Sequence, residues 1–473
     1  MDCIVGLQWE RDSHQPYPAN DNRSCTGNPP TRRGYDAAKA LYEERLRGLQ
    51  GKELDSALRS VFNEQRARLA EYLNLPDGAE VILCPSGSDA EYIPVAIAKS
   101  LHPSKQIANG ITQLNEIGAG SEPASTGKYF STHAPFLGAH DLQSLSGFDG
   151  IDGLVVSART KDGSVINASQ KMNEFAAQQL AENKFPIVHG VFGGKTGVRD
   201  EVMPASLEAG DKSIGVVDAC QGRFSSQELY EWLDEKNALV LFTSSKFYQA
   251  PPFCGAVIVP SSIAIKLSAV SPPKDMLVGP MGLGAFLTDK EIPSCLESWK
   301  EMLKNEGNNN VGLALRWEAG LAAMEAISLV PDEDRMNMSD EWASAIRKMV
   351  DANEMLDTFC VERSIVSIRI GKSGGEWLGM GEARDLYRWM SLDVSMVVPD
   401  ATEDEKTALS TLAYIGQPVN VSESHAIVRI ALGVESLLAY NADKSETLKE
   451  DDLTVRKLGA IAKHFDTLKS SGL

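Results

Sequence analysis

The chain has 473 residues, of which 43% are hydrophobic and 23% are charged, an ordinary composition for a globular protein with more than one core. Lys and Arg total 46 against 65 Asp and Glu, which gives a formal net charge of −19. Such a surface repels phosphate backbones and anionic membranes, and this argues against a nucleic-acid-binding or membrane-surface protein.

Cysteine usage and the first residues indicate the compartment. The seven cysteines are Cys3, Cys25, Cys84, Cys220, Cys254, Cys295 and Cys360. They form no CxxC pair and no zinc-like cluster with His, which is typical of free thiols in a reducing compartment. The first ten residues lack the pattern of a secretory signal, and no apolar run approaches the roughly 18 residues of a membrane span. We therefore expect a cytoplasmic protein without a metal site.

The N-terminal part predicts an arm followed by two helices. The first 33 residues are polar and rich in Pro, Asn and Arg, and they predict an irregular arm. Apolar residues then recur at helical spacing from Ala38 to Leu49 and again from Leu54 to Leu73. Pro76-Asp77-Gly78 ends the second helix. We assign residues 1–75 to this arm and its helices.

From residue 76 the pattern changes to alternating strands and helices. Apolar runs predict strands at residues 81–83, 154–156, 186–188, 214–217, 239–242 and 256–259. Each run is apolar on both faces, as strands of a covered, mostly parallel sheet are. Ser225-Ser226-Gln227-Glu228 has the capping-box pattern of a connecting helix. The sequence thus predicts a large α/β domain over residues 76–300.

Residues 301–473 predict a smaller α+β domain. One long helix carries apolar residues from Trp317 to Ile327, and a second carries those from Ile346 to Phe359, with Cys360 at its end. Strands at residues 365–370 and 426–431 form its sheet. The charged run at residues 402–406 predicts a solvated loop or a helix start.

Polar residues follow three of the predicted strands, where ligands of parallel sheets gather. Ser86-Gly87-Ser88-Asp89 offers close backbone approach and hydroxyl donors to an anion, although such a turn also serves as a simple helix cap. Asp218 follows a buried strand and can pair with a protonated pyridine nitrogen, with Gln221 within reach of the ring oxygen. An Asp that only caps a loop is the alternative.

The third strand end is Thr243-Ser244-Ser245-Lys246. A lysine withdrawn from bulk water there would favour the neutral amine that a Schiff base requires. Taken alone, a lysine after a strand is usually a surface residue. The three strand ends together favour a pyridoxal-phosphate (PLP) site instead.

This succession resembles the class V aminotransferase superfamily of fold type I PLP enzymes. Asp218 and Gln221 match its Asp-x-x-Gln segment, and Ser244 and Lys246 match its Ser-x-His-Lys segment, with Ser245 in place of the family's His. Val428-Arg429-Ile430-Ala431-Leu432-Gly433 resembles the strand whose arginine holds the substrate α-carboxylate, a task suited to a planar guanidinium.

The resemblance implies a PLP fold type I enzyme with a mostly parallel seven-stranded sheet and a smaller domain. It implies that Ser86, Gly87, Ser88, Asp89, Asp218, Gln221, Thr243, Ser244, Ser245 and Lys246 contact the cofactor. Thr196, in the segment after His189-Gly190, is a further implied contact. The residue that stacks on the ring stays unassigned, with Asn115 and Glu116 near the expected place. Cys360 lies too far from Arg429 for the nucleophile of a cysteine desulfurase.

Two rival interpretations are weaker. His189-Gly190-Val191-Phe192-Gly193-Gly194-Lys195-Thr196 nearly spells a phosphate-binding P-loop, but His189 stands where the motif requires glycine. A non-catalytic protein of the same fold would not need Asp218, Lys246 and Arg429 together.

We therefore expect an amino acid to lose its Cα proton to Lys246 and its amino group to pass to a 2-oxo acid. The alternative is a lyase that eliminates a β- or γ-substituent, because fold does not fix chemistry. The resemblance also implies a homodimer. Residues 279–282, Asn308-Asn309-Asn310 and the arm with Arg32 and Arg33 are candidates for contacts across its interface or at the site entrance.

Overall fold

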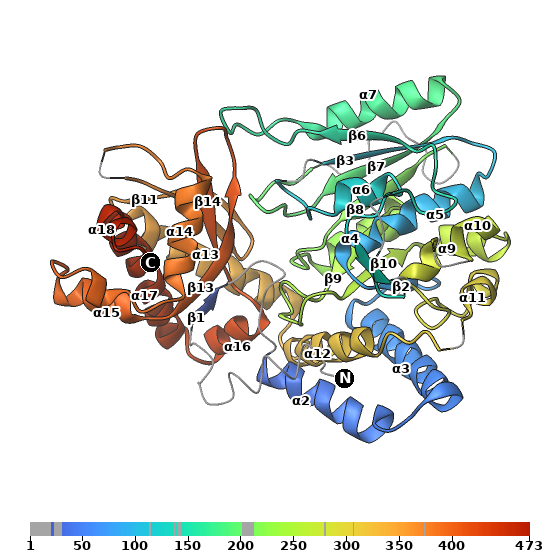
Figure 1. Ribbon diagram of the computed structural model, residues 1–473, viewed down its shortest axis with the longest axis horizontal. Coiled ribbons are helices and arrows are strands. Elements are labelled where there is room, and N and C mark those ends of the chain that lie inside the picture. The colour runs from blue at the N-terminus through green and yellow to red at the C-terminus, as the bar shows by residue number, and fades with distance from the viewer. Residues whose placement is uncertain are drawn as a thin grey trace.

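Two packed bodies, each built around one sheet, make up the molecule (Figure 1). The computed structural model describes residues 20–22, 31–112, 115–136, 138–139, 143–200, 212–278, 281–305, 307–372 and 374–473. Among these residues no helix is both long and apolar enough to cross a membrane.

The larger body contains a seven-stranded sheet in the order β2-β10-β9-β8-β7-β3-β6. The strands are β2 (Glu80–Cys84), β3 (Ile107–Thr112), β6 (Asp152–Val156), β7 (Phe185–Val191), β8 (Ile214–Asp218), β9 (Leu239–Thr243) and β10 (Gly255–Val259). β10 runs antiparallel to both of its neighbours, whereas the pairs from β9 to β6 are parallel. The six strands predicted from apolar runs are confirmed, and β7, β9 and β10 are buried along their whole length.

Strand β3 was not predicted. Its sequence, Ile-Ala-Asn-Gly-Ile-Thr, breaks the apolar run with Asn109 and Gly110, although every residue of the strand is buried. The side-chain NH2 of Asn109 has a partner there, because it donates to the Ser125 carbonyl at 2.9 Å. Gly110 is required because a Cβ would lie 2.8 Å from the sulfur of Met172 on the covering helix α7 (Ala168–Ala181). Contacts with distant segments therefore allow a strand that is interrupted by Asn109 and Gly110 to lie in the core.

Helices cover both faces of this sheet, as Figure 1 shows. The first two after β2 are α4 (Gly87–Ala90) and α5 (Tyr92–Leu101). The predicted capping box at Ser225 opens α8 (Ser226–Tyr230), with Ser225 and Glu228 exchanging both hydrogen bonds. The remaining helices of this body are α6 (Ser121–Ser125), α9 (Ser261–Ser268), α10 (Lys274–Leu277) and α11 (Glu297–Leu303).

The smaller body carries a five-stranded sheet in the order β1-β13-β14-β12-β11. Its strands are β11 (Leu356–Glu362), β12 (Ile365–Ile370), β13 (Ala413–Asn420), β14 (Ala426–Ala431) and, from the N-terminal arm, β1 (Asn20–Asn22). The helices of this body are α13 (Asp332–Asp351), α14 (Met380–Met390), α15 (Glu403–Ser410), α16 (Val434–Ala442), α17 (Lys444–Lys463) and α18 (Phe465–Ser470). Thr402 forms a capping box with Glu405, so the charged run at residues 402–406 is a helix start.

One prediction for this body is wrong. Helix α13 ends at Asp351, and the residues from Leu356 onward form strand β11 rather than a continuation of the helix. A turn closes at Asn353, whose carbonyl accepts from the Leu356 amide at 3.0 Å, and Thr-Phe-Cys-Val then favours a strand. Cys360 therefore lies on an antiparallel strand and not at the end of a helix.

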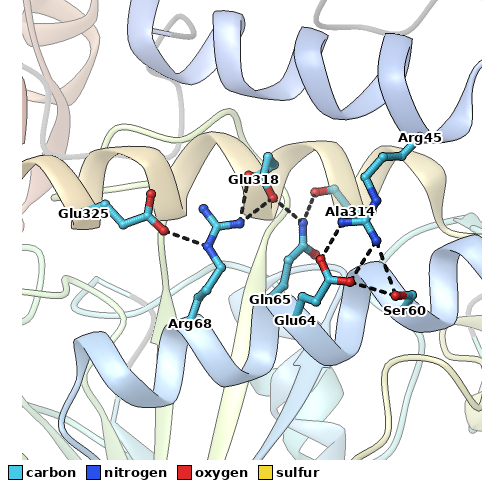
Figure 2. Close-up of polar contacts among 8 residues, drawn as sticks. All are labelled: Arg45, Ser60, Glu64, Gln65, Arg68, Ala314, Glu318 and Glu325. Atoms are coloured by element: carbon cyan, nitrogen blue, oxygen red, sulfur yellow. Dashed lines mark hydrogen bonds and ion pairs between the residues drawn. The ribbon is translucent and has the colours of Figure 1, made fainter.

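The N-terminal helices pack on helix α12 (Val311–Ile327), which also contacts α16 of the smaller body. They are α2 (Arg32–Leu41), a π-helical turn (Tyr42–Leu46) and α3 (Gly51–Tyr72). Figure 2 shows the polar side of this packing, where Arg68 on α3 bonds Glu318 and Glu325 on α12 at 2.8 and 2.7 Å. Helix α12 thus joins the arm helices to both bodies.

Candidate active site

Three chain segments that follow strands β2, β8 and β9 meet at one edge of the large sheet. A Cβ added at Gly87 would lie 2.8 Å from Cγ2 of Thr243 and 3.1 Å from the sulfur of Cys220. A Cβ at Gly255 would lie only 2.4 Å from the Ser86 carbonyl carbon. The two glycines therefore allow the loop after β2 to press against the ends of β8 and β9, which places the sequence-predicted segments side by side.

The loop after β2 has the chemistry of a phosphate cradle. Ser86 is the N-cap of α4 and accepts from the Asp89 amide at 3.1 Å, and the first-turn amides of a helix have no acceptor inside that helix. The Ser88 hydroxyl lies 3.0 Å from the position of a Cβ on Gly118, so it faces the segment after β3. Asp89 is bound within the loop, because Ser86 donates to its carboxyl group at 2.5 Å. Burial raises the pKa of Asp89 to about 7.

Asp218 ends strand β8 and is held by its own loop, since its carboxylate accepts from the Cys220 amide at 3.1 Å. His189 on β7 lies on the same face of the sheet, because Val191 pairs with Asp218 and side chains alternate along a strand. The buried His189 ring lies 3.5 Å from a carboxylate oxygen of Glu91. Burial lowers the pKa of His189 to about 4 and raises that of Glu91 well above its usual value. Asp218 thus lies on the same face of the sheet as His189, which is buried and has a pKa low enough to be neutral near pH 7.

Arg223 orients the amide of Gln221. Its guanidinium donates to the Gln221 side-chain oxygen at 2.9 Å and to the Ser364 hydroxyl at 2.9 Å and the Leu432 carbonyl at 3.3 Å in the smaller body. Because the amide oxygen faces Arg223, the amide NH2 is the group that Gln221 can offer to an acceptor. Sequence reasoning missed Arg223, although an arginine two residues after Gln221 is visible in the chain.

The loop with Lys246 is fixed to the smaller body. The Phe247 carbonyl accepts from the Val434 amide at 2.8 Å, and the Gln249 side-chain oxygen accepts from the Glu435 amide at 2.9 Å, both at the start of α16. Gln249 has a positive φ of 51°, so the chain turns sharply after the lysine.

Two of the hydroxyls predicted to contact the cofactor have hydrogen-bond partners within the protein. Thr243 donates to the Cys220 carbonyl at 2.9 Å, and the fully buried Ser244 hydroxyl contacts the Cys254 sulfur at 2.9 Å. Ser245 is also buried. The structure gives the hydroxyls of Thr243 and Ser244 partners inside the protein, and their contact with a cofactor stays a prediction.

Electrostatic coupling brings the remaining candidates together around Lys195. Burial is the main reason that the pKa of Lys195 is lowered to about 8; the charges of Lys246 and Arg429 add to the lowering, and those of Glu116 and Asp218 oppose it. Lys195 follows β7, Asp218 ends β8, Lys246 follows β9, and Arg429 lies in the middle of β14. Arg429 is almost fully buried and donates to the Gln417 carbonyl at 3.0 Å. Charged groups from other segments thus influence the pKa of Lys195.

Thr196 and Glu116 have structural roles that the sequence did not indicate. The Thr196 hydroxyl donates to Glu116 and accepts from Arg159 at 2.8 Å, and the Thr196 amide donates to Glu116 at 2.9 Å. Arg159 completes the buried cluster, 3.5 Å from the Glu116 carboxylate. All three side chains thus have partners within this cluster; a contact of Thr196 with the cofactor stays a prediction, and the ring-stacking residue stays unassigned.

Cys360 packs against the turn after β7, since a Cβ at Gly197 would lie 2.7 Å from its sulfur. Burial raises the pKa of this thiol, so the structure gives no support to a nucleophilic role.

The interface candidates have intramolecular partners. Arg33 pairs with Glu435 at 3.0 Å and Arg32 with Asp36 at 2.7 Å. Asn310 donates to Glu291 at 2.8 Å. Gly279 and Pro280 lie outside the described residues.

No family model matches the sequence. Solved structures match it over nearly its whole length. The cysteine desulfurase CsdA from Escherichia coli matches with a TM-score of 0.54 at 12% identity, covering 96% of this chain and 98% of that one. Oryza sativa TDC with PLP and tryptamine matches with a TM-score of 0.54 at 14% identity, covering 95% and 87%.

A third match is the glutamate decarboxylase domain of diaminobutyrate-pyruvate transaminase and L-2,4-diaminobutyrate decarboxylase from Vibrio parahaemolyticus. Its TM-score is 0.52 at 12% identity, and it covers 93% of this chain and 81% of that one. These likenesses concern the fold, because identities this low carry no activity. The predicted fold is confirmed: the chain has the fold type I architecture of PLP-dependent enzymes.

Proposed function

We propose that the chain is a PLP-dependent enzyme acting on an amino acid, with Lys246 as the Schiff-base lysine. The observation that supports this proposal is that the segments after β8 and β9, with Asp218 and Lys246, meet the loop after β2, and that the lysine loop is bonded to the start of α16, which follows the strand of Arg429. A protein that used the fold only as a scaffold would have no need for the half-buried Asp218 and Lys246 or the buried Arg429 in these segments.

The residues present fit PLP chemically. The amides and hydroxyls of Ser86 to Ser88 suit the phosphate, Asp218 suits the protonated ring nitrogen, and the amide NH2 of Gln221 suits the ring oxygen. When bound, PLP supplies an electron sink for the electron pair left on Cα after one of its bonds breaks. In this proposal Lys246 would take up and return the Cα proton.

Arg429 supports a reaction at the Cα–H bond. A guanidinium that holds the α-carboxylate with two parallel hydrogen bonds opposes cleavage of the bond between Cα and this carboxylate. The bond aligned for cleavage is then the Cα–H bond. We therefore propose amino transfer from an amino acid to a 2-oxo acid. Elimination of a β- or γ-substituent begins with the same proton removal and is the second candidate. The homodimer and the cytoplasmic location stay predictions.

The first test is the visible spectrum of the purified protein with added PLP, before and after borohydride. We expect a band that borohydride removes in the wild type and that Lys246→Ala lacks. Lys171→Ala, which removes an exposed lysine on the outer helix α7, is the matched control and should keep the band. A wild-type protein without such a band, or a Lys246→Ala variant that retains it, would refute the proposal.

The second test separates the reactions by their products. A transaminase converts bound cofactor to its amine form with an amino donor alone and returns it with a 2-oxo acid. A lyase instead releases an oxo acid and ammonia without any acceptor. Release of carbon dioxide from the donor would contradict the role given to Arg429.

A further inference from the structure

The hairpin between strands β11 and β12 reaches from the smaller body to the larger one. Strand β11 ends at Glu362 and β12 begins at Ile365, so Arg363 and Ser364 make a two-residue connection. Arg363 has a positive φ of 50°, which residues other than glycine adopt mainly in tight turns. We call residues 360–364 the hairpin tip.

The hairpin tip packs against the chain segments that follow strands β7 and β8. Its contacts join Cys360 to Gly197, Glu362 to Arg199, Arg363 to Glu228 at 2.6 Å and Ser364 to Arg223 at 2.9 Å. A Cβ added at Gly193 would lie 3.9 Å from Cγ of Glu362 and 4.0 Å from Cγ of Gln221. Glu362 of the hairpin tip and Gln221 of the candidate site thus border the same turn.

Ser364 in the hairpin tip fixes the arginine that orients Gln221. The buried Ser364 hydroxyl accepts from Nε of Arg223, and the same guanidinium donates to the Gln221 side-chain oxygen at 2.9 Å. The backbone of Ser364 is also held, because its carbonyl accepts from the Leu432 amide at 2.9 Å. A displacement of the hairpin tip would therefore move Arg223 and change the direction in which Gln221 offers its amide NH2.

Two ion pairs cross between the bodies at the hairpin tip. Arg363 in the smaller body bonds Glu228 in the larger one, and Arg199 in the larger body bonds Glu362 in the smaller one. Arg199 also lies 3.7 Å from Glu228. The side chains of Arg363 and Glu228 are each only 20% exposed, and salt and water screen such a pair less than one at the surface. The pair of Arg363 and Glu228 therefore contributes to holding the hairpin tip against the larger body.

We propose that Arg363 is a positioning residue of the candidate active site. Its ion pair with Glu228 holds the hairpin tip in place, and the hairpin tip in turn orients Gln221 through Arg223. The effect at the cofactor rests on the proposed function, which assigns the Gln221 amide to the ring oxygen. Arg363 itself is assigned no contact with substrate or cofactor.

The first test measures the loop of Gln221 before PLP is added. Amide hydrogen exchange of the purified full chain would be followed in residues 219–224. Arg363→Met removes one charge, and Glu228→Gln removes the other while keeping a residue that supports the capping box. We expect exchange about fivefold faster in either variant, which corresponds to about 1 kcal/mol, and no faster exchange in the double variant. Arg363→Lys keeps the charge and should exchange like the wild type, as should Arg347→Met, which removes an exposed partner of Asp351.

The second test uses the pH midpoint at which the cofactor band changes, because a hydrogen bond to the ring oxygen contributes to it. Gln221→Ala should shift this midpoint, and Arg363→Met should shift it in the same direction by a smaller amount. Arg363→Met should add nothing in the Gln221→Ala protein, since the residue through which it acts is then missing. Loss of stability alone would lower the unfolding midpoint without moving the pH midpoint.

The inference is wrong if Arg363→Met leaves exchange in residues 219–224 unchanged, if exchange in helix α17 rises equally, or if Arg363→Lys behaves like Arg363→Met. It is also wrong if Arg363→Met leaves the wild-type pH midpoint in place or shifts that of the Gln221→Ala protein. Failure of the proposed function is distinct, because the wild type would then lack the band while the exchange results obtained before PLP is added would stand.

Discussion

Helix α12 approaches the lysine loop so closely that a single methyl group should disturb it. A Cβ added at Gly320 would lie 2.6 Å from both Cβ and Oγ of Ser244 and 3.3 Å from Cβ of Ala250. Gly320→Ala must therefore displace Ser244, two residues before Lys246, by several tenths of an ångström. Overpacking of this kind costs about 1–3 kcal/mol, and the better helix propensity of alanine returns only about 1 kcal/mol. We expect a net loss of up to about 2 kcal/mol.

Denaturant unfolding measures this loss, and the cofactor band reports on the displaced loop. Adding Ser244→Gly removes both close atoms, so the double variant should recover more than the two single changes predict. Gly312→Ala on the same helix is the control, because its Cβ would meet only the mobile end of Arg316 at 3.1 Å. A Gly320→Ala protein as stable as wild type, or one that gains nothing from Ser244→Gly, would refute the reasoning.

Other expectations concern buried charge. The pKa of Asp89, raised by burial from 3.8 to about 7, means that the folded protein keeps a proton that the unfolded chain releases. Unfolding free energy should therefore fall by about 1.4 kcal/mol per unit as pH rises from 4 to 7, and Asp89→Asn should remove this slope in urea titrations; equal slopes would contradict it. Lys290, fully buried and 2.9 Å from Asp55, should cost about 3–5 kcal/mol in urea unfolding when changed to Met, and an unaffected midpoint would refute its pairing. Arg223→Lys cannot span the partners of Arg223, so PLP dissociation by equilibrium dialysis and unfolding should both become easier; a change in neither would show that Arg223 does not position Gln221.

The sequence predicted strands that carry continuous apolar runs, including the edge strand β6, which is half-exposed and not covered on both faces as expected, and it failed where distant contacts decide the structure. Strands β8 and β9 carry continuous apolar runs, so their burial is visible locally. The burial of strand β3 is not visible in its sequence, because Asn109 interrupts the apolar run and its hydrogen-bond partner Ser125 lies in another element. Strand β11 follows an amphipathic helix, and its own apolar residues happened to continue the helical spacing.

The site was predictable in its positions and not in its pairings. Asp218 ends strand β8 and Lys246 follows strand β9, so topology alone brings them to one edge of the sheet. Which hydroxyls stay available depends on partners far away, as with Thr196 and Glu116, which are 80 residues apart. Lys195 was hidden for the same reason, since the charges that act on it come from other strands.

Because the lysine loop is hydrogen-bonded to helix α16, ligand binding at Arg429 should be visible in the cofactor spectrum. Strand β14, which carries Arg429, leads directly into α16, and α16 is bonded to the residues that follow Lys246. A ligand that moves β14 therefore also moves the backbone next to the lysine. Simple carboxylates that touch only Arg429 should thus change the colour of the bound cofactor, which makes the protein its own optical indicator of binding.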